Sequence, residues 1–63
     1  MKRQQIMKAL SAEAKRQGLS LLITEGGSHT KVSIGDRHTT VPRHNEINEI
    51  TAKAILKHMG VKP

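Results

Sequence analysis

The chain has 63 residues and a formal net charge of +6, from 11 basic and 5 acidic side chains. We expect a single domain over residues 1–63 with a thin core, because a chain of this length buries only about 60% of its unfolded surface. The absence of cysteine excludes disulfides and thiolate metal sites. No apolar run approaches the roughly 18 residues that span a membrane, so we expect a cytoplasmic protein without a membrane segment.

The excess of positive charge predicts attraction to a polyanion, with nucleic acid favoured over an acidic protein partner. The chain has no Phe, Tyr or Trp, whereas modules that read single-stranded RNA usually stack bases on aromatic rings. Nucleic-acid binding should therefore depend on phosphates, sugar hydroxyls and helix shape, with little preference for sequence.

The first segment, residues 2–17, predicts a helix, because Ile6, Met7, Leu10 and Ala14 follow helical spacing. Gly18 follows this stripe and fits the left-handed position that ends many helices.

Three strand-like runs come next, at residues 19–24, 29–34 and 37–41. Gly35-Asp36 suits a two-residue type II′ hairpin between the second and third runs. A four-residue loop at 25–28 would join the first run to the second. The two connections predict a three-stranded antiparallel sheet.

The two hairpins, taken separately, predict registers that agree with each other. The opposed pairs are Ile34 with Arg37, Val32 with Thr39 and Thr30 with Val41, and then Ile23 with Thr30, Leu21 with Val32 and Leu19 with Ile34. These registers gather one apolar face from Leu19, Leu21, Ile23, Val32, Ile34 and Val41. His29 and Lys31 fall on the opposite, polar face, because neighbouring side chains of a strand point to opposite sides.

A second helix is predicted near the end of the chain. Asn48 is the expected N-cap, and Gly60 fits the C-terminal cap. The helical stripe between them consists of Ala52, Ile55, Leu56 and Met59. The order αβββα predicts an α+β fold in which two helices cover one face of the sheet. The other face stays open and polar.

His29 is the candidate catalytic residue, because it follows the turn at Gly26-Gly27-Ser28 and begins the second strand. An imidazole can accept a proton at neutral pH, and cleavage of RNA through its own 2′-hydroxyl needs such a base. The register places His29 near Pro42, close to the basic residues that follow. A solvated or structural histidine is the competing interpretation.

Cleavage also needs cations on the phosphate and an acid for the leaving oxygen. Lys31 and Arg43 are candidate phosphate ligands, and His44 could protonate the leaving oxygen. For Lys31 and Arg43 the alternative is a solvated positive face. For His44 the alternative is an ordinary loop histidine.

Three short motifs resemble the HicA family of mRNA interferase toxins: Gly27-Ser28-His29, the string TVPRH at residues 40–44, and AILKHMGV at residues 54–61. The resemblance covers nearly the whole chain in matching order and spacing. It implies a fold similar to a double-stranded-RNA-binding domain, cleavage of mRNA that arrests translation, and a HicB-type antitoxin as the partner. The catalytic histidine of the family corresponds to His29, and we expect Ser28, Lys31, Arg43 and His44 to bind RNA.

The chain departs from the family pattern at two positions. Thr30 stands where many members have a second histidine, and Leu19 stands where many have an aromatic residue. The first difference bears on substrate positioning and the second on packing.

The sequence therefore predicts a metal-independent endoribonuclease, the toxin of a type II toxin–antitoxin pair, with His29 as general base and no cofactor. One alternative is a non-catalytic module that binds double-stranded RNA, and another is an adaptor for an acidic protein. His29 distinguishes the endoribonuclease from the non-catalytic RNA-binding module, because a simple RNA binder does not need a histidine at this position.

The remaining histidines have simpler interpretations. His38 should lie in solvent at the far end of the sheet, roughly 13 Å from His29. His58 falls in the last turn of the second helix, where a cation favours the helix dipole. A zinc site built from His38 and His44 would lack a third ligand.

Overall fold

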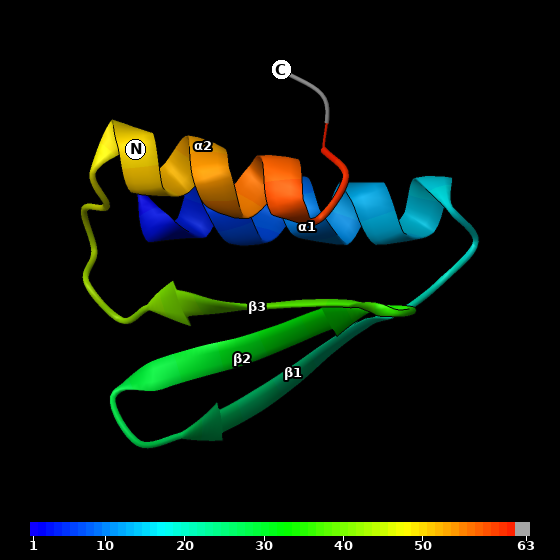
Figure 1. Cartoon of the computed structure of the whole chain (residues 1–63), viewed down its shortest axis with the longest axis horizontal. Coiled ribbons are helices and arrows are strands. Elements are labelled where there is room, and N and C mark those ends of the chain that lie inside the picture. Colours follow the sequence, from blue (N-terminus) through cyan, green and yellow to red (C-terminus); the bar gives the residue numbers. More distant parts are fainter. Residues whose placement is uncertain (62–63) are drawn as a thin grey trace.

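The α+β arrangement predicted from the sequence is confirmed by the computed structural model, which describes residues 1–61. The elements are α1 (Arg3–Arg16), β1 (Leu21–Gly26), β2 (His29–Ile34), β3 (Arg37–Pro42) and α2 (Glu49–His58). The strands form one antiparallel sheet in the order β1-β2-β3. The helices lie side by side on the same side of this sheet, and both begin at the end where β3 finishes (Figure 1).

Both helices end as the sequence predicts. The N–H of Leu19 donates to the carbonyl of Ala14 at 2.8 Å, and the N–H of Val61 donates to the carbonyl of Leu56 at 2.8 Å. In both cases the N–H of the residue after the glycine bonds to the carbonyl five residues earlier, as in a Schellman motif. The predicted N-cap of α2 is also confirmed, because the side-chain oxygen of Asn48 accepts a backbone N–H of the first turn at 2.8 Å.

The register between β2 and β3 matches the prediction, with Ile34 opposite Arg37 and Thr30 opposite Val41. The predicted register between β1 and β2 is wrong by two residues. Glu25, not Ile23, lies opposite Thr30, and the other pairs of this hairpin shift with it. A shift of two residues keeps each side chain on its predicted face, because the side-chain repeat of a strand is two.

The error comes from the connection between β1 and β2, which is a two-residue turn at Gly27-Ser28 and not a four-residue loop. Gly27 has a φ of 60°, and Gly35 in the other hairpin has a φ of 57°. Ser28 and Asp36 both have negative φ, so each turn has a left-handed residue at its first central position only. This is the pattern of a type II′ turn, whose twist suits antiparallel strands. The shorter turn lets β1 run from Leu21 to Gly26 instead of over residues 19–24.

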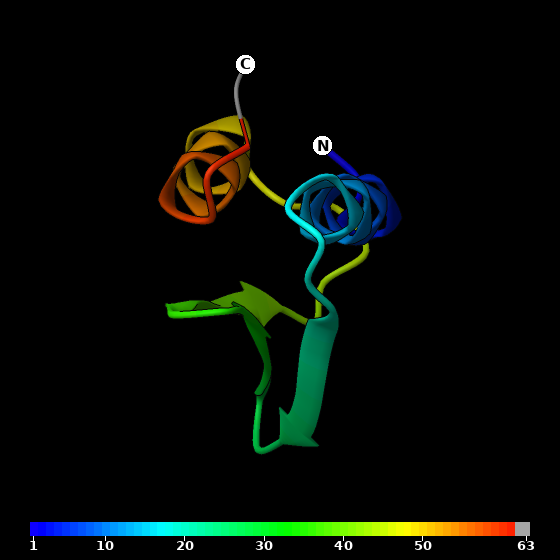
Figure 2. The ribbon, with the colours of Figure 1, turned by 90° about the vertical axis from the view of Figure 1, so that its right-hand side faces the viewer.

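The core lies between the helices and the inner face of the sheet. Its buried apolar members are Ile6, Leu10, Ala14, Val32, Ile34, Val41, Ile47, Ala52, Ile55 and Met59. Two residues predicted for this face are not in it, because Leu19 is 44% exposed and Ile23 is 49% exposed. Leu19 precedes β1, and the twist of the sheet carries β1 down and away from the helices (Figure 2).

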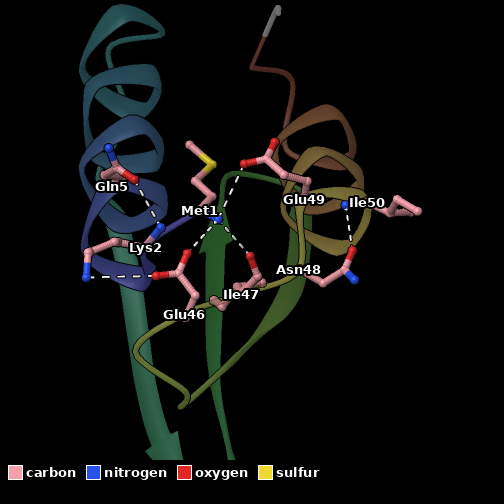
Figure 3. Close-up of polar contacts among 8 residues, drawn as sticks. All are labelled: Met1, Lys2, Gln5, Glu46, Ile47, Asn48, Glu49 and Ile50. Atoms are coloured by element: carbon pink, nitrogen blue, oxygen red, sulfur yellow. Dashed lines mark hydrogen bonds and ion pairs between the residues drawn. The ribbon is translucent and has the colours of Figure 1, made fainter.

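The N-terminal residues hold the connection between β3 and α2 against α1 (Figure 3). The ammonium of Met1 lies 3.0 Å from a carboxylate oxygen of Glu46 and donates to the carbonyl of Ile47 at 2.8 Å. The N–H of Arg3 donates to the carbonyl of Asn45 at 2.9 Å. The hydrogen bond to Glu46 raises the pKa of the ammonium. The connection between β3 and α2 begins at Arg43, and these contacts fix its later part at residues 45–47.

Candidate nucleic-acid interface

His29 is the first residue of β2 and is exposed to solvent. It pairs with Gly26 on one side and Pro42 on the other, so its predicted position beside Pro42 is confirmed. The hydroxyl of Ser28 lies 3.3 Å from Nδ1 of the imidazole. The turn before it is the part of the chain farthest from the helices in both views (Figures 1 and 2).

The alternation of β2 separates two kinds of side chain. Thr30, Val32 and Ile34 point toward the helices and are buried. His29 and Lys31 point to the open face, where both are exposed. Two residues of a strand span about 7 Å, so the imidazole and the ammonium of Lys31 can reach one bound phosphodiester.

The side chain of Arg43, another predicted RNA ligand, does not bind on the open face beside His29 and Lys31. Its Nη2 donates to a carboxylate oxygen of Glu25 at 3.0 Å. Glu25 pairs with Thr30 and therefore belongs to the helix side of the sheet, not to the open face. His44 follows Arg43 and is exposed. The structure thus brings His29 and Lys31 together on one face and ties Arg43 to the opposite side of the same sheet end.

Two residues that sequence reasoning missed, Arg3 and Glu25, complete a polar network at this end of the sheet. Nη2 of Arg3 donates to the hydroxyl of Thr30 at 2.7 Å, and Nε donates to the carbonyl of Pro42 at 3.2 Å. The Thr30 hydroxyl in turn donates to the Glu25 carboxylate at 2.8 Å. This bond from Thr30, together with Arg43, lowers the pKa of Glu25. Arg3 and Thr30 are 27 residues apart, so no local pattern could reveal their contact.

Thr30, which stands where a second histidine would be expected, is fully buried in this network. Its side chain lies on the opposite side of the sheet from His29, because the two residues are adjacent in β2. Thr30 therefore serves the junction between α1 and the sheet and does not line the open face.

The other histidines lie at the far end of the sheet. His38 is opposite Ser33, and its backbone carbonyl lies 3.0 Å from Nε2 of His58. Within residues 1–61, no three His, Cys, Asp or Glu side chains are grouped closely enough to hold a metal ion. A hollow of about 730 Å³ lies between the helices, lined partly by Lys53 and Leu56, and none of the predicted site residues borders it.

No family model, curated protein or solved structure matches this chain. In the described part of the chain, no helix is long and apolar enough to cross a membrane. The case for a function therefore depends on the chemistry of the sheet end and on the sequence motifs.

We predict that Thr30→Val lowers the free energy of unfolding by about 1–3 kcal/mol, because Arg3 loses its acceptor and Glu25 loses a donor. Valine has a similar shape and favours strands, so the loss would report the hydroxyl. Thr40→Val on the exposed face is the matched control and should change stability by less than about 0.5 kcal/mol. Equal urea midpoints for the two variants would show that the Thr30 network contributes nothing to the fold.

Proposed function

We propose that this protein is a cytoplasmic endoribonuclease of the HicA type that cleaves mRNA and arrests translation. The observation that carries the proposal is an exposed imidazole, His29, beside the ammonium of Lys31 on an open sheet face. The motifs around His29 and at residues 40–44 support it, as does the net charge of +6. Because the chain has no Phe, Tyr or Trp, we propose that RNA is held by its phosphates and sugars.

In the proposed reaction the neutral imidazole of His29 removes the proton of a 2′-hydroxyl. The 2′-oxygen attacks the adjacent phosphorus and forms an O2′–P bond, while the P–O5′ bond breaks. The 5′-oxygen leaves with a proton, for which His44 is the candidate donor, and the products are a 2′,3′-cyclic phosphate and a 5′-hydroxyl. Lys31 would stabilise the charge that develops on the phosphate oxygens. No metal or cofactor takes part in this scheme.

The proposal predicts that His29→Ala relieves the growth arrest caused by the wild-type chain and lowers the rate of mRNA cleavage by about 10²–10⁴. His38→Ala is the matched control, because His38 is exposed on the same sheet face at the other end. It should leave both toxicity and cleavage close to the wild-type level.

Cleavage by purified protein and growth after induction would measure these effects. If His29→Ala is as toxic and as active as the wild type, His29 is not the base. RNA binding without cleavage by the wild type would instead favour a non-catalytic module for double-stranded RNA.

We further propose that a HicB-type antitoxin inhibits this protein by covering the open face. Leu22 is 63% exposed on that face, and it belongs to β1, which is an edge strand of the sheet. Leu22 is opposite Ser33 and therefore diagonal to Lys31 on this face, and an exposed apolar side chain near a cation suits a partner with an apolar and acidic contact surface. Such a partner would exclude RNA from His29 physically.

This inhibition predicts that diethyl pyrocarbonate modifies His29 rapidly in the free protein and slowly in an inhibited complex. His58 on α2 lies on the other side of the sheet and is the internal reference, whose modification rate should not change. Rapid modification of His29 in a fully inhibited complex would place the antitoxin on another surface.

A further inference from the structure

Arg3 and Arg43 flank a single carboxylate at the end of the sheet that carries His29. A depression of about 430 Å³ is lined by these two arginines and Glu25. The arginines come from segments far apart in the chain, the first residue of α1 and the residue after β3. Arg3 donates to the Thr30 hydroxyl, and that hydroxyl and Arg43 both donate to the same carboxylate oxygen of Glu25.

The two arginines differ in how strongly the fold fixes the orientation of their side chains. Arg3 is half-buried and donates both to the Thr30 hydroxyl and to the carbonyl of Pro42, so its orientation is set by the fold. The partners of the other ion pair are open to water, since Arg43 is 45% exposed and Glu25 is 60% exposed. An ion pair between exposed side chains contributes little stability, so a competing anion can separate it at low cost.

We propose that Arg3 and Arg43 form a second phosphate site for the RNA that reaches His29, and that Glu25 occupies Arg43 until the RNA displaces it. This inference rests on the proposed function and identifies how the same sheet end holds its substrate. A guanidinium binds carboxylate and phosphate with the same fork of N–H donors, so Glu25 stands in for a phosphate in the free protein. Lys31 then contacts the phosphate at His29 on the open face, and the Arg3–Arg43 pair contacts another phosphate of the same RNA on the helix side of the sheet end.

The displacement has a consequence that a plain basic patch would not have. Removing the carboxylate of Glu25 should strengthen RNA binding, because Arg43 no longer has to exchange partners. Glu25→Gln keeps an oxygen that can accept the Thr30 hydroxyl, so the network around Arg3 stays in place. The gain should disappear when Arg43 is absent, since the two residues act through one contact.

The test measures the affinity for an mRNA fragment in a His29→Ala background, so that the RNA remains intact. Glu25→Gln should bind about two- to fivefold more tightly than the parent. Asp36→Asn makes the same charge change in the turn at the opposite end of the sheet and should alter affinity by less than about 1.5-fold at physiological salt. Arg43→Ala should weaken binding, lower the salt slope by up to about 1, and abolish the effect of Glu25→Gln.

An equal gain from Glu25→Gln and Asp36→Asn, or a gain from Glu25→Gln that persists without Arg43, would overturn the inference while leaving RNA binding intact. No RNA binding by any variant would overturn both the inference and the proposed function. Thermal melts of each variant establish that the affinities belong to folded protein.

Discussion

The alternation of side chains along β2 is the constraint on which the rest of this structure depends. β2 is the central strand, so its register decides what both neighbouring strands present to the helices. Val32 and Ile34 must face inward to form the core, and this forces His29 and Lys31 outward. A slip of one residue would bury a histidine and a lysine without partners, which is costly in a core this small. Folding therefore places the imidazole in solvent.

A polar network lies at the same end of the sheet, on the face that packs against the helices. The Thr30 hydroxyl links the first turn of α1 to Glu25, and Glu25 links onward to Arg43. The network holds together three parts of the chain that share no local sequence signal: the start of α1, the hairpin of β1 and β2, and the segment after β3. It also divides the basic residues of this end between the two sides of the sheet. An RNA that engages both sides would have to pass around the sheet end at His29.

The sequence predicted the elements and the faces of the sheet because these follow from periodicity and caps. Gly18 and Asn48 sit where helices of this pattern end and begin, and the structure confirms both. The β1 register was missed although its signal was present, since Gly27-Ser28 has the same glycine-first form as Gly35-Asp36. The exposure of Ile23 could not be predicted, because it depends on the twist that separates β1 from the helices. The contacts of Arg3 and Glu25 are long-range pairings that no spacing in the sequence reveals. The roles of His29 and its neighbours in catalysis and RNA binding remain predictions.

The most direct test of His29 as a base acting on RNA is the dependence of cleavage on the 2′-hydroxyl. The scissile bond in an mRNA fragment is first mapped with purified wild-type protein, and the fragment is then made with a single 2′-deoxynucleotide on the 5′ side of that bond. Cleavage of the unmodified fragment should leave a 2′,3′-cyclic phosphate, and the deoxy-substituted bond should stay intact under the same conditions. Equal rates for the two fragments would contradict the mechanism, because a base that removes the 2′-hydroxyl proton has no role when that hydroxyl is absent.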